Sequence, residues 1–286
     1  MDRQTILLIS DMRQVCLAEI LTKKGHNVRC LDIRNRETAL QQLEKLERFL
    51  DKADVLILPI PVQKVPEQEI FYDILNKNLE KKTLVMGGCF STEQRELLTG
   101  RDIHFLDFME DTVVTEENAV ATAEGTIAEL VEKSPYNIDE AKVLVTGYGY
   151  CGKAIAKRLG ALGARVTVLA RRKEARKEAK GDGFYAVDFA FGPEEAMGAA
   201  MVVNTVPALV VTEKIIRELP RDAYIVDIAS GEGGTDFACA REYGIHADHV
   251  LGIPGKYAPK ESAYILERSV ERFILKEKQG EMSDGF

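Results

Sequence analysis

Short apolar runs alternate with amphipathic stretches along the first part of the chain. Residues 5–9, 55–58 and 83–86 form continuous apolar runs, as expected of strands that are buried on both faces. Between them, residues 37–53 carry an apolar stripe at helical spacing, made by Leu40, Leu43, Leu46, Phe49 and Leu50. The alternation predicts repeated strand–helix units, and so an α/β fold with a parallel, doubly wound sheet.

The second part repeats this pattern after an expected crossover helix over residues 118–133. Predicted strands follow at 142–146, 165–169, 184–187, 201–204 and 223–227. We therefore expect two doubly wound parallel-sheet domains, the second a Rossmann domain. Residues 1–120 would form a flavodoxin-like domain on the substrate side, completed by a C-terminal helix over 259–276, and residues 121–258 would bind the dinucleotide.

A glycine-rich turn follows the strand at 142–146. It has the spacing G-x-G-x-x-G, with Gly147, Gly149 and Gly152 at the fixed positions and Tyr150 and Cys151 between the last two. Gly147 permits the turn, Gly149 lets a pyrophosphate approach the backbone, and Gly152 lets the helix pack closely on the strand. A glycine-rich turn without a ligand is the alternative, but the next strand arrives at the distance that a dinucleotide fold requires. In such a turn, a helix N-terminus would favour the thiolate of Cys151; the alternative is an unreactive residue, because the variable positions of such turns accept many small side chains.

The end of the strand at 165–169 bears on which dinucleotide is bound. NAD sites place Asp or Glu there, whereas this chain has Ala170 followed by Arg171 and Arg172. A carboxylate would repel a 2′-phosphate, and a guanidinium binds one with several hydrogen bonds. The pattern favours NADP over NAD; the alternative is that the two arginines begin a solvated basic helix.

Three segments lie just past predicted strands, where the carboxyl edge of a sheet would face the nicotinamide. The cofactor-facing candidates in the first two segments are Asn204, Thr205, Val206, Pro207, Ile228, Ala229 and Ser230. The third segment, 252–260, would bring Lys256 and Lys260 toward the site. Turns and helix caps are the alternative for each segment, with Thr235 or Asp236 as a candidate cap.

Composition and charge narrow the function classes. A net charge of −8 argues against a nucleic-acid surface and against an anionic membrane surface. No run approaches the roughly 20 apolar residues of a membrane helix, and the amino end lacks a signal-peptide core, so we expect a cytoplasmic protein. Five dispersed cysteines predict neither disulfides nor zinc, and His246 and His249 would point to opposite faces of a strand, so no metal site is expected.

These motifs are where the chain resembles a known family, the A subunit of dipicolinate synthase. The resemblance covers nearly the whole chain and rests on the segments at 122–125 (Thr-Ala-Glu-Gly), 142–149, 204–208, 233–237 and 252–260. The Gly-Gly and Pro-Gly segments are also similar to alanine dehydrogenase and to the transhydrogenase nucleotide domain. This wider similarity is less specific.

The resemblance implies a reaction and partners. NADP⁺ would oxidise the dihydro-dicarboxylate ring made from pyruvate and aspartate semialdehyde to pyridine-2,6-dicarboxylate during sporulation, together with the flavoprotein-like B subunit of dipicolinate synthase. Two substrate carboxylates need cations, for which Arg13, Lys256 and Lys260 are the candidates, and a base must take a proton, for which Glu124 or Asp236 are the candidates. A helix cap or a surface ion pair is the alternative role for each. A homodimer is expected on general grounds.

Two other functions fit the same residues. An NADP-dependent dehydrogenase of a small 2-oxo or amino acid would share the cofactor site. A non-catalytic NADP-binding subunit would explain why no His–Asp pair stands out in the sequence.

Overall fold

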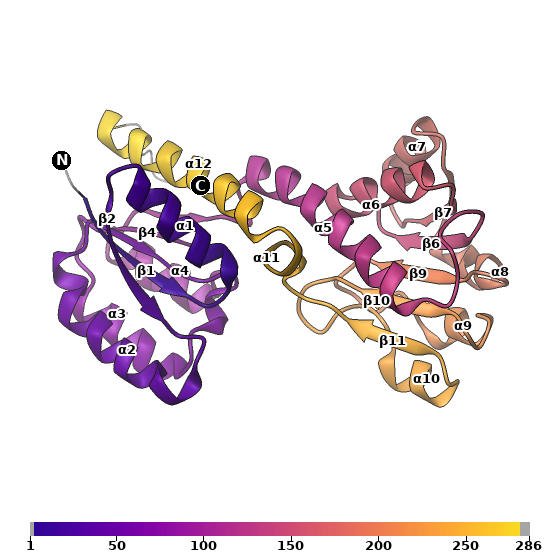
Figure 1. Ribbon diagram of the computed structural model, residues 1–286, viewed down its shortest axis with the longest axis horizontal. Helices are drawn as coiled ribbons and strands as arrows, with labels where there is room; N and C mark the ends of the chain where they lie inside the picture. Colours follow the sequence, from indigo (N-terminus) through magenta and orange to yellow (C-terminus); the bar gives the residue numbers. More distant parts are fainter. Residues whose placement is uncertain (1–2, 281–286) are drawn as a thin grey trace. The chain divides into compact units, whose positions relative to one another are not determined.

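The computed structural model describes residues 3–280 and divides the chain into two compact units (Figure 1). The first unit joins the segment up to Glu117 to the segment that begins at Pro259, and the second unit is Asn118–Ala258. Each unit holds one parallel sheet with helices on its faces. The predicted α/β class with two parallel-sheet domains is therefore confirmed.

The sheet of the first unit has the strand order β2-β1-β3-β4-β5, with all neighbours parallel. Its strands are β1 (Gln4–Ile9), β2 (Asn27–Asp32), β3 (Val55–Ile57), β4 (Leu84–Gly87) and β5 (Phe105–Asp107). The order reverses between β1 and β3, so the loops after these two strands diverge at the carboxyl edge, the usual place for a ligand in such sheets.

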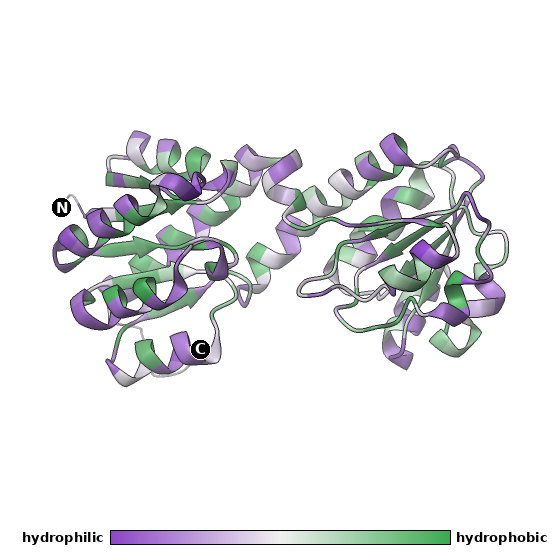
Figure 2. Cartoon of the chain, turned by 90° about the horizontal axis from the view of Figure 1, so that it is seen from below, coloured by the Kyte–Doolittle hydropathy of each residue, from purple (hydrophilic) through white to green (hydrophobic). Residues whose placement is uncertain are grey.

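Helices cover both faces of this first sheet. They are α1 (Met12–Lys23), α2 (Arg36–Phe49), α3 (Gln68–Asn78), α4 (Thr92–Gly100) and α12 (Pro259–Gln279), with short 3₁₀ turns η1 (Leu50–Lys52) and η2 (Val62–Lys64). Leu8 faces the core with α2 and α3, whereas its neighbour Leu7 faces the core with α1 and α12. Much of the sheet is green in Figure 2 because its residues are hydrophobic, and β3 and β4 are buried on both faces. The last helix of the chain thus lies beside the first one.

The second unit has a six-stranded sheet in the order β11-β10-β9-β6-β7-β8. Its strands are β6 (Lys142–Thr146), β7 (Arg165–Leu169), β8 (Tyr185–Val187), β9 (Met201–Asn204), β10 (Tyr224–Asp227) and β11 (His246–His249). The first strand of the unit, β6, lies between β7 and β9. The order reverses there, which places the glycine-rich turn at the point where such sheets bind dinucleotides.

Helix α5 (Thr112–Lys133) begins in the first unit and enters the second at Asn118. Six further helices and one 3₁₀ turn complete the described part of the second unit. They are α6 (Tyr150–Ala161), α7 (Lys173–Gly181), η3 (Phe189–Phe191), α8 (Gly192–Ala196), α9 (Glu213–Ile216), α10 (Phe237–Glu242) and α11 (Ile253–Tyr257). Val145 of β6 packs with α5, α6 and α7, and Leu144 packs with α8, α9 and α10. The sheet is therefore covered on both sides.

Helix α5 begins six residues before the predicted start at residue 118. Asp111 caps it, because its Oδ1 accepts from the backbone N–H of Val113 at 3.0 Å. Helix α2 ends at Phe49, short of the predicted residue 53, and continues as η1. Neither difference moves a strand.

Candidate functional site

The glycine turn after β6 has the geometry that the motif requires. Gly147 has φ +84°, which L side chains rarely adopt, and its N–H donates to the carbonyl of Leu169 at 2.8 Å. A Cβ at Gly152 would lie 2.4 Å from the carbonyl oxygen of Gly147, whereas one at Gly149 would meet nothing within 4 Å. Helix α6 therefore starts tightly against the turn, and the backbone at Gly149 is open to a ligand. These residues fit a dinucleotide phosphate site.

The two variable positions of the turn differ in exposure. The Tyr150 side chain is exposed, and Cys151 is half-buried. Burial raises the pKa of the Cys151 thiol and outweighs a hydrogen bond with Thr122 that acts the other way. Burial therefore favours the unreactive alternative for Cys151, because it disfavours the charged form of the thiol.

No carboxylate lies at the tip of β7. Ala170 is buried there, and Arg171 and Arg172 are both exposed. Within residues 3–280, neither guanidinium forms an ion pair or a hydrogen bond with another side chain. Both cationic groups are thus available to a ligand at this edge of the sheet.

The loop after β9 packs against the glycine turn. The hydroxyl of Thr205 donates to the carbonyl of Thr146 at 2.6 Å, and a Cβ at Gly147 would lie 2.6 Å from that hydroxyl. The side-chain oxygen of buried Asn204 accepts from the hydroxyl of Thr146 and from the N–H of Val206, the latter at 3.1 Å. Asn204 therefore shapes the loop, while the exposed Pro207 continues it.

The loop after β10 is held by Asp227, a buried carboxylate that was not among the predicted site residues. It accepts from the N–H of Ala229 at 3.0 Å and from the N–H of Gly234 at 2.7 Å. Ala229 is buried, Ile228 is half-buried and Ser230 is exposed. The sequence signal for Asp227 is an acid that ends an apolar strand just before a glycine-rich segment.

Gly234 joins the β9 and β10 loops. A Cβ there would lie 2.2 Å from the carbonyl oxygen of Ala208 and 2.3 Å from that of Val206. The next residue but one, Asp236, caps α10, because its Oδ1 accepts from the N–H of Cys239 at 2.9 Å. The sequence left two roles open for Asp236, a helix cap and a catalytic base. The structure shows the helix cap.

The other four candidate side chains belong to different units. Glu124 and Lys256 lie in the second unit, and Arg13 and Lys260 lie in the first. Glu124 is 63% exposed, with its carboxylate 3.8 Å from the guanidinium of Arg158. Lys260 is exposed at the start of α12.

Lys256 is held by a carboxylate that no sequence pattern singled out. Its Nζ and the hydroxyl of Tyr257 each donate to the fully buried Glu129 of α5 at 2.6 Å, and Nζ of Lys133 lies 3.1 Å from the other oxygen. Burial opposes ionisation of Glu129, yet these hydrogen bonds prevail and lower its pKa to about 2. A Cβ at Gly125 would lie 2.3 Å from Ile253, so α11 also packs closely on α5. Two motifs of the family resemblance, at 122–125 and 252–260, thus contact each other.

Arg13 lies at the carboxyl edge of the first sheet, beside the point where the strand order reverses. Its guanidinium pairs with Asp11 at 2.7 Å and donates to the carbonyl of Ile60 at 3.1 Å. Nζ of Lys64, which follows β3, lies 3.0 Å from the same carboxylate. Burial raises the pKa of Asp11, but the two cations outweigh it and lower the pKa to about 2. Two cations on one carboxylate leave an excess positive charge there.

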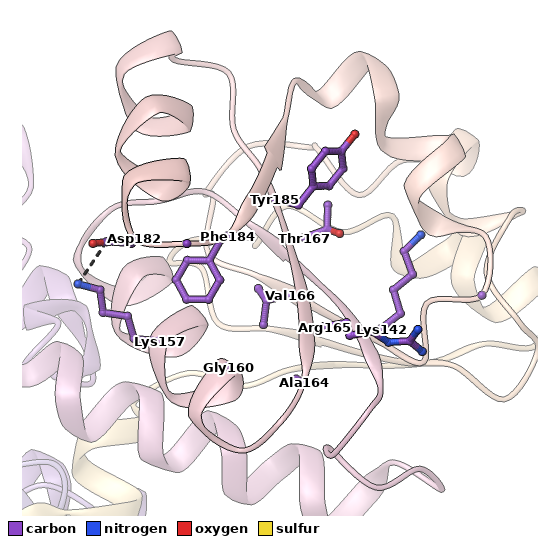
Figure 3. A pocket seen from close by; sticks show the side chains of 12 residues that line it. Lys142, Lys157, Gly160, Ala164, Arg165, Val166, Thr167, Asp182, Phe184 and Tyr185 are labelled. Carbon is purple, nitrogen blue, oxygen red and sulfur yellow. Dashed lines mark ion pairs between the residues drawn. The ribbon is translucent and has the colours of Figure 1, made fainter.

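A hollow of about 960 Å³ lies away from the glycine turn (Figure 3). Lys142 and Arg165, the first residues of β6 and β7, line it, so it lies at the amino edge of the second sheet. Lys157 pairs there with Asp182 at 3.2 Å. The dinucleotide turn lies at the opposite edge, so this hollow is not part of that site.

Residues 10–109 match the N-terminal domain of the dipicolinate synthase A subunit, and residues 112–234 match the NAD binding domain of D-isomer specific 2-hydroxyacid dehydrogenases. The A subunit of dipicolinate synthase from Bacillus subtilis (strain 168) is 32% identical over 164 residues, which are 57% of this chain and 55% of that protein. The chain is similar to the dipicolinate synthase A subunit. The aligned part spans only about half of that curated relative.

Solved structures of the dipicolinate synthase A subunit extend the similarity over both units. The one from Bacillus halodurans has a TM-score of 0.79 at 25% identity, covering 94% of this chain and 97% of that chain. The one from Bacillus subtilis has a TM-score of 0.78 at 22% identity, covering 98% of each chain, and supports the fold. The resemblance to this family is confirmed, and the second unit has the dinucleotide-binding fold of an oxidoreductase family.

Two further features are absent from residues 3–280. No described helix is both long enough and apolar enough to span a membrane. No group of three or more His, Cys, Asp or Glu side chains in that range is arranged to hold a metal ion.

Proposed function

We propose that the chain is an NADP-dependent oxidoreductase that acts as the A subunit of a dipicolinate synthase. The observation that carries the proposal is the combination of an open glycine turn in the second unit with an N-terminal domain that matches this family. In this proposal, residues 1–120 with the helix from residue 259 contribute the substrate side, and residues 121–258 bind the cofactor.

The choice of NADP rests on the end of β7. Arg171 and Arg172 are exposed and unpaired among the described residues, and Ala170 replaces the acid that would accept from a ribose hydroxyl. Guanidinium groups bind a phosphate monoester with charge-assisted hydrogen bonds. The 2′-phosphate would therefore add binding energy here.

The substrate is a cyclic dihydro-dicarboxylate in this proposal. Its carboxylates would be bound by the excess positive charge at Arg13 and Lys64, with Lys256 and Lys260 as the other cations. When bound at the glycine turn, NADP⁺ would supply the acceptor for a hydride from a ring carbon. Glu124 or Asp236 would take the proton that is lost as the ring becomes aromatic, so two electrons and two hydrogens leave the ring in total.

An ultraviolet assay tests this function directly. The protein, NADP⁺ and freshly made condensation product of pyruvate and aspartate semialdehyde are mixed with and without the B subunit, and dipicolinate and NADPH are followed together. Equal rates of both products, faster with NADP⁺ than with NAD⁺, support the proposal. Cofactor binding without any product in either mixture would contradict it.

Separate substitutions test the assigned roles. The variants Glu124→Gln, Asp236→Asn and Lys256→Met are each compared with the parent chain in kcat for dipicolinate formation. Their affinity for NADPH is measured as the control that the cofactor site is intact. Loss of kcat on the order of 100-fold with unchanged affinity is the expected result for the base. A chain that tolerates all three substitutions with full product formation would be a nucleotide-binding scaffold whose partner carries the chemistry.

The match of residues 112–234 favours a second candidate function, a dehydrogenase of a small 2-oxo or 2-hydroxy acid. NADPH oxidation with pyruvate, with or without ammonia, would favour it over dipicolinate formation. A cytoplasmic dimer working with the flavoprotein-like B subunit during sporulation completes the first proposal.

A further inference from the structure

Arg176 of α7 holds the backbone of the turn that carries Arg171 and Arg172. Its Nη1 donates to the carbonyl of Ala170 at 2.7 Å and to the carbonyl of Arg171 at 2.6 Å. Its backbone N–H donates to the carbonyl of Arg172 at 3.2 Å. One residue therefore contacts all three consecutive carbonyls between β7 and α7.

Arg176 itself is fixed by a carboxylate on the neighbouring strand. Nη1 donates to Oδ2 of Asp188 at 2.6 Å, and the two side chains are 22% and 39% exposed. Asp188 directly follows β8, which pairs with β7 in parallel register, and its other oxygen accepts from the N–H of Ala190 at 3.3 Å. The carboxylate of Asp188 thus lies beside the turn 170–172, but it follows β8, whereas NAD sites carry an acid at the end of the strand that corresponds to β7.

The pair has two consequences for a phosphate at this turn. A free carboxylate at Asp188 would repel a 2′-phosphate, and the guanidinium of Arg176 neutralises it. All three acceptors lie at Nη1 of Arg176, whose two N–H groups they share, so this nitrogen is engaged with the turn and with Asp188. The exposed Arg171 and Arg172 are the cations assigned to the phosphate.

We propose that Arg176 and Asp188 are positioning residues for the adenosine 2′-phosphate: together they anchor the turn 170–172 so that Arg171 and Arg172 face the phosphate, and neither touches it. The inference rests on the proposed NADP function and deepens it. It assigns cofactor discrimination to a residue pair outside the glycine motif and outside the end of β7.

Binding of two mononucleotides isolates the 2′-phosphate. The dissociation constants of 2′,5′-ADP and 5′-AMP are measured by calorimetry on the full chain and on Arg176→Gln. We expect Arg176→Gln to bind 2′,5′-ADP on the order of 10-fold more weakly, because Arg171 and Arg172 lose charge-assisted contacts with the phosphate when the turn is no longer anchored. The dissociation constant of 5′-AMP should change by less than about twofold. Equal weakening of both ligands, or no weakening, overturns the inference.

Arg165→Gln is the matched control. Arg165 lies at the other end of β7 and also donates a guanidinium N–H to a carbonyl, that of Glu140, at 2.9 Å. Both mononucleotides should bind this variant as they bind the parent chain. Should Arg176→Gln fail to fold, Arg176→Lys keeps the charge but loses the fork, and it should still weaken 2′,5′-ADP selectively.

Asp188→Asn separates charge from geometry. Removing the carboxylate charge should leave 2′,5′-ADP binding equal or tighter, whereas the double variant with Arg176→Gln should stay weak because the carbonyls lose their donor. If the double variant binds 2′,5′-ADP as tightly as the parent chain, Arg176 acts only by neutralising Asp188, and the proposal that it anchors the turn is wrong. A parent chain that binds both mononucleotides equally contradicts the NADP proposal itself; a parent with a preference that Arg176→Gln leaves intact contradicts only this inference.

Discussion

Gly152 sets how closely α6 begins behind the nucleotide turn. In Gly152→Ala the new Cβ would lie 2.4 Å from the backbone oxygen of Gly147, so helix or turn must shift. We expect the free energy of unfolding to fall by about 1–3 kcal/mol and dinucleotide binding to weaken. Denaturant unfolding and NADPH titration measure the two effects.

Gly149→Ala and Gly181→Ala are the comparisons. A Cβ meets nothing within 4 Å at either position, so both variants should keep their stability. Only Gly149→Ala should weaken NADPH binding, because its methyl group occupies the space that the pyrophosphate needs. Wild-type affinity in Gly149→Ala would mean that the phosphates approach elsewhere.

The buried carboxylate of Glu129 predicts a pH dependence. Its pKa falls from an ordinary 4.5 to about 2 in the folded chain, so the carboxylate stabilises the fold above its ordinary pKa, and this contribution is lost as the pH falls toward 2. Glu129→Gln should therefore cost up to about 3 kcal/mol near neutral pH, and the cost should shrink as the pH falls from about 4.5 toward about 2. Unfolding measured at both ends of this range tests it; a cost independent of pH contradicts it.

Residues that act through local spacing were predictable, and residues that act through distant contacts were not. The turn at Gly147, Gly149 and Gly152 follows from spacing alone. The partner of Lys256 could not be foreseen, because Glu129 is 127 residues away and reads as an ordinary helix charge. Burial of the Cys151 thiol likewise depends on α5, which no local pattern reveals.

At the scale of elements, the strand pattern carried most of the fold. The inner strands of both sheets, such as β3, β4, β9 and β10, are apolar runs buried on both faces, a signal that needs no tertiary information, whereas the edge strands β2 and β11 are polar and partly exposed. Helix boundaries were predicted less accurately: α5 begins after its cap Asp111, and the polar segment 116–118 inside the helix hid its first turn from the sequence pattern. Strand order follows from contacts between segments that are far apart in the sequence.

The contact between α5 and α11 is tight enough to test with one methyl group. In Gly125→Ala the Cβ would lie 2.3 Å from Ile253 and 2.6 Å from the ring of Tyr257. We expect a loss of about 1–3 kcal/mol in unfolding free energy. Val131→Ala on the same helix, at a side chain that is 65% exposed, should change stability by less than about 0.5 kcal/mol. A Gly125→Ala variant as stable as Val131→Ala would show that α11 moves away at no cost.

At the scale of the whole molecule, the first unit is built from both ends of the described chain. Phe273 of α12 is buried in the core that α1 shares with the sheet, whereas Leu275 of the same helix is 51% exposed. Phe273→Ala should destabilise the first unit by about 3–5 kcal/mol, and Leu275→Ala by less than about 0.5 kcal/mol. In Phe273→Ala, amide hydrogen exchange should show reduced protection in residues 3–117 and 259–280. Equal loss of protection across residues 118–258 would contradict the division into two units.

This interleaving has a consequence for biosynthesis. Because a ribosome makes the chain from its amino end, residues 118–258 emerge and can fold while the sheet of β1–β5 still lacks α12. Until then, Leu7, Ile57 and Met86 of the growing chain have no cover from that helix, and this nascent surface is what a chaperone would bind. The second unit can therefore complete its fold before the first, although it comes second in the sequence.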